Sequence, residues 1–250
     1  MTEPAPAPTP HRTFTSRRRI FLGDASMSGR LRLDAIAQFL QDLASNDAED
    51  ADLDHGRGWI LRRMELDVTR LPTIYEDVEL ATWCSGVGGR WAERSTSIAD
   101  TRAVEGGVCA VARAVWVYVD LETGTPRSLE PSFFSVYGEE VRTQKVSARL
   151  RHRAPSPEAK RRPWPLRVTD FDVFAHVNNA VYWSAVEDEL AEWLQARRLG
   201  HCEMEFRAGV DPGDRPDLLV EAGPEVLALW FVVGDDVRAS ARIQLQPACT

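Results

Sequence analysis

Apolar residues recur with helical spacing in two stretches of this chain. The first stretch carries them at Leu33, Ile36, Ala37, Leu40, Leu43 and Ala44. The second stretch carries them at Trp183, Val186, Leu190, Trp193 and Leu194. Positions three and four residues apart lie on one face of an α-helix, so each stretch predicts a helix with a single apolar face. Such a face has to be buried against another element.

Runs rich in β-branched and aromatic residues follow each predicted helix and are typical of strands. In the first half they span Trp59–Val68, Val78–Ser85, Trp91–Asp100 and Val108–Leu121. In the second half they span Cys202–Ala208, Leu218–Ala222, Val226–Val233 and Val237–Leu245. A short strand is also expected before each helix, at Arg19–Asp24 and Leu166–Asp170. This order predicts an α+β fold in which each half wraps an antiparallel sheet around a long helix.

The two halves form a weak internal repeat, in which equivalent residues such as Asp24 and Asp170 lie 146 positions apart. At this offset the polar residues of the second half correspond to different residues of the first: Asp172 to Ser26, His176 to Arg30 and Asn178 to Arg32. Because only the aspartate pair is shared, we interpret Asp24 and Asp170 as structural. The other polar residues then belong to one chemical site per chain.

The repeat suggests four segments: a flexible Pro/Ala leader at 1–14, a first domain at 15–149, a linker at 150–165 and a second domain at 166–250. Four prolines in the linker exclude a regular helix or a central strand there. The linker region is also basic, with Arg149, Arg151 and Arg153 at its start. Two interpretations remain open, a solvated linker and a docking surface for an acidic partner.

Composition narrows the function. The chain has 250 residues, 44% of them hydrophobic, and a formal net charge of −8, which disfavours nucleic-acid binding. No apolar run is long enough to span a membrane, and the N-terminus lacks a signal-peptide pattern. The cysteines form no CxxC pair and the histidines no metal-ligand spacing, so we expect free thiols in a cytoplasmic protein without metal or cofactor.

The candidate chemistry lies in Val168–Leu190, where an apolar run ends in two carboxylates and a helix begins. Asp170 and Asp172 are followed by His176 and then by two asparagines. A helix start offers free backbone N–H groups and the positive end of a dipole to an anion.

This stretch contains DFDVFAHVNNAVYW, which resembles the DxDxxxHVNN signature of acyl-acyl-carrier-protein (acyl-ACP) thioesterases and, more loosely, the 4-hydroxybenzoyl-CoA-type thioesterases. Four stretches of the first half are similar to the same family in order and spacing: Leu40–Asp47, Gly58–Pro72, Val78–Gly86 and Ala114–Leu129. The resemblance covers roughly Arg17 to Leu245. It implies two tandem hotdog domains that hydrolyse a fatty acyl thioester on ACP. Because the repeat leaves the acid/base residues in the second half alone, we expect the first domain to supply the acyl channel.

Thioester hydrolysis needs an attacking group and a sink for the oxyanion. We expect Asp172 to act as general base for water, or as nucleophile through a mixed anhydride; the alternative is a helix or turn cap. His176 could orient the water or polarise the carbonyl. Of the asparagines, Asn178 is assigned to the site and Asn179 to the helix cap. The backbone around Val177–Asn179 is the expected oxyanion hole.

Three positions depart from the plant members of the family. Phe174 stands where those members have asparagine, and Gly209 and Val210 match their glutamate–cysteine pair. The nearest thiol, Cys202, is interpreted as a small buried apolar residue.

Two rival functions stay open: an acyl-CoA thioesterase with the same site, and a non-hydrolytic hotdog protein that binds acyl chains. A monomer and a homodimer are both compatible with the sequence, which does not determine acyl chain length.

Overall fold

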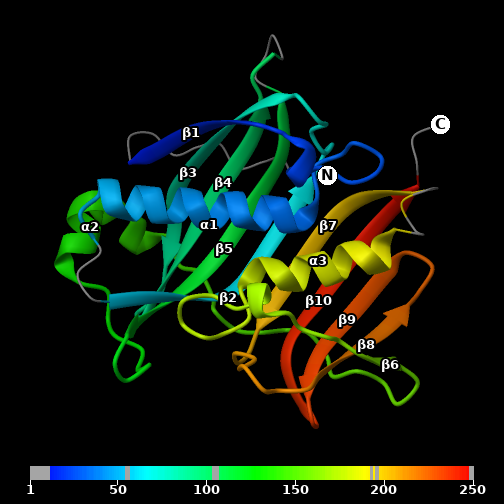
Figure 1. Cartoon of the computed structure of the whole chain (residues 1–250). Coiled ribbons are helices and arrows are strands. Elements are labelled where there is room, and N and C mark those ends of the chain that lie inside the picture. Colours follow the sequence, from blue (N-terminus) through cyan, green and yellow to red (C-terminus); the bar gives the residue numbers. More distant parts are fainter. Residues whose placement is uncertain (1–11, 54–56, 103–106, 192–193, 195–196, 248–250) are drawn as a thin grey trace. The chain divides into compact units, whose positions relative to one another are not determined.

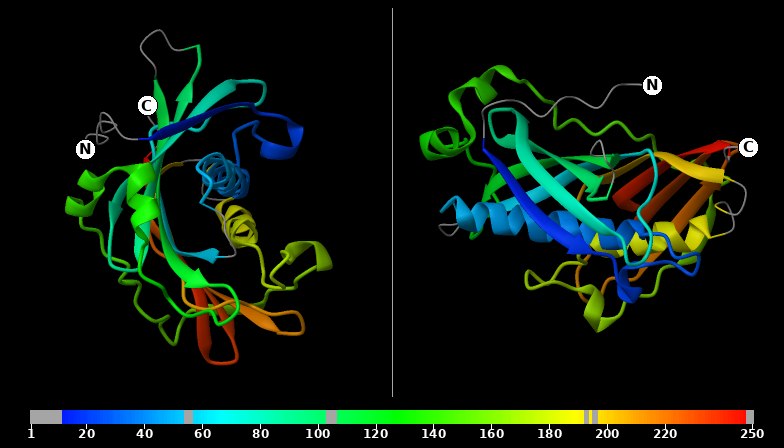
Figure 2. Two further views of the ribbon diagram at one scale, coloured as in Figure 1. Left: turned by 90° about the vertical axis from the view of Figure 1, so that its left-hand side faces the viewer. Right: turned by 90° about the horizontal axis from the view of Figure 1, so that it is seen from above.

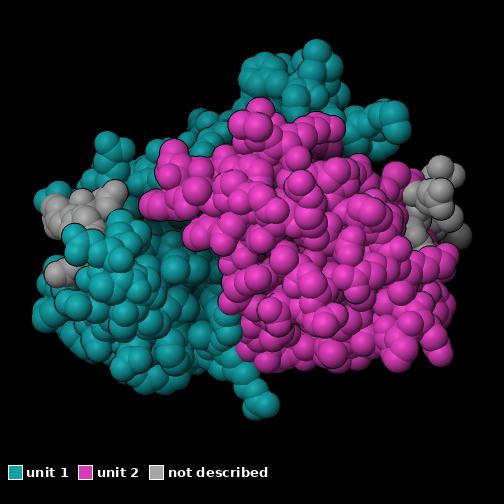
Figure 3. Space-filling model, turned by 60° about the horizontal axis from the view of Figure 1, so that its bottom comes forward, with its two compact units in different colours: residues 1–31, 38–149 teal, residues 32–37, 150–250 magenta. Residues whose placement is uncertain are grey.

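The computed structural model describes residues 12–53, 57–102, 107–191, 194 and 197–247. The chain divides into two compact units, which Figure 3 colours separately. Unit 1 comprises Met1–Leu31 and Gln38–Arg149, and unit 2 comprises Arg32–Ala37 and Leu150–Thr250. Among the described residues, no helix is long and apolar enough to cross a membrane. Most of the predicted leader, together with Trp193 and Cys249, lies outside the described residues.

Unit 1 is built on an antiparallel sheet. Its strands are β1 (Thr13–Arg19), β2 (Arg57–Val68), β3 (Asp77–Val87), β4 (Trp91–Asp100) and β5 (Val108–Asp120), in the spatial order β1-β3-β4-β5-β2 (Figure 1). Buried and partly exposed side chains alternate at the start of β3, as expected for a strand with one face on a core. Thr13 and Phe14, which the sequence placed in the leader, belong to β1.

Helix α1 (Leu33–Asp50) is the first predicted helix, and it lies on the concave side of the unit 1 sheet (Figure 2). Its side chains Phe39, Leu40 and Leu43 are buried there. A short helix, α2 (Pro131–Tyr137), and the 3-10 turn η2 (Glu139–Thr143) complete unit 1. The sequence did not predict α2, because seven residues are too few to show a helical period.

Unit 2 repeats this plan. Its strands are β6 (Lys160–Pro163), β7 (Arg197–Phe206), β8 (Pro216–Ala222), β9 (Val226–Val233) and β10 (Asp236–Pro247), in the spatial order β7-β10-β9-β8-β6. Helix α3 (Asn179–Leu190) packs on them through Tyr182, whose ring meets those of Phe206 and Phe231 edge-on at 5.5 Å and 4.9 Å between centroids. The predicted α+β class, with a sheet wrapped around a helix in each half, is confirmed.

Two predicted elements are corrected. The stretches Arg19–Asp24 and Leu166–Asp170 are not strands: they contain the 3-10 turns η1 (Leu22–Asp24) and η3 (Val168–Asp170). In each, an aspartate side chain accepts a backbone N–H group three residues earlier, which turns the chain where a strand would extend it.

The predicted linker is held along the unit 2 sheet. Its residues 160–163 form the edge strand β6, which is compatible with prolines because an edge strand leaves some N–H groups unpaired. Nearer its start, Arg151 and His152 donate their backbone N–H groups to the fully buried carboxylate of Glu205. The indole N–H of Trp230 donates to the carbonyl oxygen of Arg153 at 2.8 Å.

Candidate active site

The loop before each helix starts with the same turn in both halves. In η1 the backbone N–H of Phe21 donates to Asp24 Oδ2 at 2.9 Å. In η3 the N–H of Arg167 donates to Asp170 Oδ2 at 2.6 Å. The aspartate shared by the two halves therefore closes a turn, and its predicted structural role is confirmed.

The second copy of the loop continues with a bond from the Asp172 N–H to the carbonyl oxygen of His176 at 2.9 Å. The matching donor and acceptor in the first copy are Ser26 and Arg30, at 2.8 Å. Each loop also contains a left-handed residue, Gly29 (φ 82°) in the first copy and Ala175 (φ 58°) in the second. A left-handed residue other than glycine costs about 1 kcal/mol. The polar copy of the loop therefore keeps a strained backbone.

Asp172 has one oxygen engaged and one available. Its Oδ1 accepts the backbone N–H of Phe174 at 2.9 Å and that of His176 at 3.4 Å. Its Oδ2 makes no hydrogen bond with the described residues. The side chain is partly exposed. Asp172 thus caps its own loop, as the alternative interpretation expected, and still presents a second carboxylate oxygen.

The start of α3 corrects the assignment of the two asparagines. Asn178, not Asn179, is the N-cap: its Oδ1 accepts the N–H of Ala180 at 2.9 Å. Two of the expected oxyanion donors are also occupied. The N–H of Val177 donates to the carbonyl oxygen of Val210 at 3.0 Å, and the N–H of Asn178 to that of Asp170 at 2.9 Å.

One donor remains at this helix start. The backbone N–H of Asn179, the first residue of α3, makes no hydrogen bond within the part of the chain that the structure describes. Its equivalent at the start of α1 is Leu33, whose N–H donates to the carboxylate of Glu187 at 2.7 Å. The same position of the repeat therefore binds an anionic oxygen in one copy and is open in the other.

His176 lies beside the segment that follows β7. A methyl group added at Gly209 would stand 2.8 Å from His176 Cδ2, so only glycine leaves room for the imidazole ring. The Nε2 atom of the ring lies 3.2 Å from Asp211 Oδ1. Both side chains are exposed, at 53% and 66%. The hydrogen bond from Val177 to Val210 ties the two segments together.

Two family models match the chain along most of its length. The acyl-ACP thioesterase N-terminal domain matches residues 11–137, and the acyl-ACP thioesterase C-terminal domain matches residues 154–242. The chain belongs to the acyl-ACP thioesterase family. The reaction class of this family is thioester hydrolysis.

Relatives and a solved structure match from 60% to 97% of this thioesterase. An uncharacterized protein of Mycobacterium tuberculosis is 28% identical over 232 residues, 92% of this chain and 91% of that protein. A chloroplastic acyl-[acyl-carrier-protein] hydrolase of Cuphea viscosissima is 27% identical over 163 residues, 60% of this chain and 37% of that protein. The crystal structure of a Lactobacillus plantarum protein assigned as an oleoyl thioesterase superposes with a TM-score of 0.85 at 21% identity, over 97% of this chain and 99% of that one. The fold is the double hotdog predicted from the resemblance.

The positions at which this thioesterase departs from the plant pattern have different surroundings: Phe174 is exposed on the loop, whereas Val210 is buried and, like Gly209, lies in the segment after β7. Phe174 is 63% exposed and Val173 is 94% exposed, so neither side chain fills a core. The space that a side chain at position 209 would need is occupied by the imidazole of His176. Position 209, where the plant members have glutamate, is thus a glycine that leaves space for the ring of His176.

Sequence reasoning missed several polar residues near this loop. Asp211 and Asp214 come from the segment after β7, and Arg238 from β10. Burial raises the pKa of Tyr182 on α3; the charge of Arg238 lowers it, and those of Asp172, Asp211 and Asp214 raise it. The Nε atom of Arg238 is buried and has no hydrogen-bond partner among the described residues. Only Tyr182 carried a signal in the sequence, since it follows the HVNN motif.

The three arginines considered for docking have different surroundings. The guanidinium of Arg153 pairs with Glu221 and lies 5.5 Å from the ring centre of Trp230, so it is part of the linker's attachment. Arg149 and Arg151 are exposed. Their backbones are fixed, since the Arg149 carbonyl oxygen accepts from Arg63 and the Arg151 N–H donates to Glu205.

One cluster of possible metal ligands lies outside the loop, where His152, Glu203 and Glu205 meet. The imidazole Nδ1 of His152 hydrogen-bonds Ser240 at 2.9 Å, and Nε2 lies 3.3 Å from Glu203. Glu205 accepts N–H groups from Arg151, His152 and Arg207. Through the bonds of Glu205 and His152, the cluster anchors the start of the linker to the unit 2 sheet.

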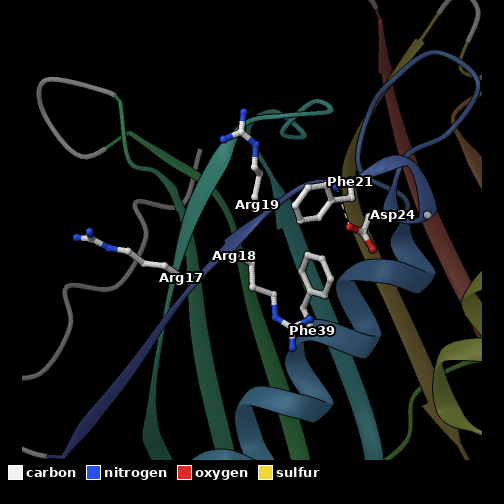
Figure 4. Close-up of a pocket in the computed structure, with 7 residues that line it drawn as sticks. Arg17, Arg18, Arg19, Phe21, Asp24 and Phe39 are labelled. Atoms are coloured by element: carbon white, nitrogen blue, oxygen red, sulfur yellow. Dashed lines mark hydrogen bonds between the residues drawn. The ribbon is translucent and has the colours of Figure 1, made fainter.

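A pocket of about 520 Å³ opens in unit 1 between β1, η1 and α1 (Figure 4). Its lining includes the three consecutive arginines of β1. Each of these faces a carboxylate: Arg17 pairs with Glu79 at 3.1 Å, Arg18 with Asp42 at 2.5 Å and Arg19 with Asp77 at 3.8 Å. The pocket therefore carries little unpaired positive charge. The described cysteines are buried and form no disulfide with one another, and Cys202 is 0% exposed on β7, as interpreted from the sequence.

Proposed function

We propose that this thioesterase hydrolyses fatty acyl-ACP to a free fatty acid and ACP. The observation that carries the proposal is the match of the N- and C-terminal acyl-ACP thioesterase models, in order, to the two halves of the chain. The Cuphea relative, an acyl-[acyl-carrier-protein] hydrolase by name, supports a carrier-bound substrate.

The attacking water loses its proton to Oδ2 of Asp172. This oxygen is available because the loop's own N–H groups bond to Oδ1. Those two bonds fix the orientation of the carboxylate, which a general base requires. The same oxygen could attack the carbonyl directly and form a mixed anhydride, but hydrolysis through water needs no second step.

The oxyanion of the tetrahedral intermediate is bound by the backbone N–H of Asn179. The occupied equivalent, the N–H of Leu33 on a carboxylate oxygen, supports this assignment. The start of α3 adds the favourable end of a helix dipole. Removal of one oxyanion donor typically costs about 3 kcal/mol of barrier.

Departure of the carrier needs little acid assistance, because a thiol has a pKa of about 8.5 and leaves readily as a thiolate. His176 is left to orient the water at the carbonyl carbon. The reaction then needs one carboxylate, one imidazole and a helix start, all from the second half. We therefore expect one active site per chain.

Matched acyl-ACP and acyl-CoA substrates of several chain lengths, followed by thiol release, test the proposal. We expect a higher kcat/KM on acyl-ACP than on acyl-CoA of the same chain. A strong preference for CoA would support the acyl-CoA thioesterase instead.

A second candidate function is a non-hydrolytic acyl-binding protein. The capping role of Asp172 favours it, because the bonds of this carboxylate to the loop backbone are a reason for its presence that involves no catalysis. Purified protein that binds acyl-ACP and releases no thiol above the uncatalysed rate would support this second function.

A further inference from the structure

We propose that Asp211 is the positioning residue of His176 and takes the place of the glutamate that this chain lacks at position 209. The inference rests on the proposed function, since it concerns the imidazole of that site. It starts from the 3.2 Å contact between His176 Nε2 and Asp211 Oδ1. No other side chain of the described residues makes an ion-pair contact with this ring.

The contact is built by the backbone. Gly209 provides the space in which the imidazole lies, and Val210 accepts the N–H of Val177, the residue after His176. Asp211 follows directly in a closed turn, where its N–H donates to Asp214 Oδ2 at 2.9 Å and its carbonyl oxygen accepts the N–H of Asp214 at 3.1 Å. Three consecutive residues thus leave space for the imidazole ring, bond to the backbone next to it and place a carboxylate beside it.

The chemistry of the pair selects one form of the ring. A carboxylate only accepts hydrogen bonds, so the imidazole nitrogen that faces it carries the proton. In the neutral ring the proton then sits on Nε2, and Nδ1 is left as the acceptor for a water or a substrate group. Asp211 therefore determines which nitrogen His176 presents to the reaction.

The first half of the repeat has the same backbone hydrogen bond but neither the histidine nor the aspartate. The N–H of Leu31 donates to the carbonyl oxygen of Pro72 at 2.8 Å, as Val177 does to Val210. The next residue there is Thr73, which pairs through its backbone with Arg30, the counterpart of His176. The residue after this backbone hydrogen bond is a carboxylate, Asp211, in the half that has an imidazole, and a threonine, Thr73, in the other half.

The pair contributes little to stability, because exposed ion pairs are worth about 0–1 kcal/mol. Its effect is expected in kcat: a catalytic group misplaced by about 1 Å can lose up to ~100-fold in rate. KM should change little, since the contact of Asp211 is with the histidine and its carboxylate is exposed.

The test compares Asp211→Ala, Asp211→Asn and the control Asp214→Asn in the full-length chain. Long-range proton–nitrogen NMR at a pH where the imidazole is neutral reports which ring nitrogen of His176 is protonated. We expect Asp211→Ala to turn the Nε2–H form into a mixture and to lower kcat about tenfold or more. Asp211→Asn, whose side-chain carbonyl still accepts a hydrogen bond, should retain most of both properties, and Asp214→Asn should change neither.

An unchanged tautomer in Asp211→Ala overturns the inference, whatever the turnover. A changed tautomer with unchanged kcat overturns it as well, because the orientation would then have no part in the reaction. If the wild-type protein releases no thiol but the tautomer responds to Asp211, the proposed hydrolysis fails while the placement of His176 by Asp211 is supported.

Discussion

The two aspartates of the second loop look alike in sequence, two positions apart, and differ in what their carboxylates can do. Asp170 accepts a backbone N–H in a turn that both halves share. Asp172 caps the loop with one oxygen and has the other available. An asparagine at either position keeps the capping oxygen and removes the base. Asparagine substitutions therefore test the catalytic role of each carboxylate while its capping bond is retained.

We therefore expect Asp172→Asn to lower kcat by at least ~100-fold, as for loss of a general base, with the melting temperature nearly unchanged. Asp170→Asn is the matched control and should keep kcat within a small factor. Steady-state thiol release and thermal unfolding measure both. Near-normal turnover in Asp172→Asn would exclude Asp172 as the base.

Cys202 provides a second test at the residue scale, because it is the thiol nearest in sequence to the position of the plant cysteine. It is 0% exposed on β7, whereas reactive thiols are accessible. Cys202→Ala should leave kcat nearly unchanged and cost about 1 kcal/mol of unfolding free energy, a typical value for a single substitution. Complete loss of turnover in a folded Cys202→Ala protein would restore a thiol mechanism.

At the scale of elements, α1 is attached to unit 1 by a buried ion pair as well as by apolar contacts. Asp47 is 1% exposed, and its carboxylate accepts hydrogen bonds from Arg94 at 2.6 Å, Tyr137 at 2.8 Å and Arg12 at 2.7 Å. Burial raises the pKa of Tyr137 to about 12, so its phenol stays protonated and donates. The helix is thus held to β4 by an ion pair and to α2 by a hydrogen bond from a neutral phenol.

We expect Asp47→Asn to lower the unfolding free energy by about 3–5 kcal/mol, because it leaves the buried guanidinium of Arg94 without its counter-charge. Asp42→Asn on the same helix removes an exposed pair with Arg18, 55% exposed on the aspartate side, and should cost no more than about 1 kcal/mol. Urea unfolding of the two variants measures the difference. Equal costs would show that the buried pair is not a main support of α1.

At the scale of the whole molecule, the chain is a duplicated hotdog with chemistry in one copy. The first copy keeps the loop, the turn and the helix start, but has Ser26, Arg30 and an occupied N–H group where the second has its polar set. The domain limits 15–149 and 166–250, one site per chain and the choice between monomer and homodimer stay predictions.

The proposed docking of the carrier is also tested at the scale of the whole molecule. Arg149 and Arg151 have fixed backbones and exposed side chains, so an acidic carrier could meet them without a conformational change. Replacing both by glutamine should raise KM for acyl-ACP by about three- to tenfold, as exposed ion pairs of up to ~1 kcal/mol allow, and leave KM for acyl-CoA nearly unchanged. The double change Arg90→Gln and Arg198→Gln controls for the loss of two exposed charges. An equal rise for both substrates would argue against docking there.

The sequence by itself determined the two longer helices, most strands and the duplication, because apolar periodicity and a repeat at an offset of 146 residues can both be read from the order of residues along the chain. It also located Asp172, His176 and the asparagines, since they lie within a few residues of one another. It failed where a carboxylate competes with the strand: the bonds of Asp24 and Asp170 to backbone N–H groups produced turns at Leu22–Asp24 and Val168–Asp170.

Only the tertiary structure decided which atoms of these residues are available. Asn178 and not Asn179 caps α3, through a local bond that depends on the backbone conformation at the helix start. Val177 donates to Val210 and Asp211 faces His176, because the segment after β7 returns to the loop from more than 30 positions away in the chain. No local pattern records such a meeting. The residue types of the site can be read from the chain, but the hydrogen bonds that engage one oxygen and leave another open depend on how the backbone folds back on itself.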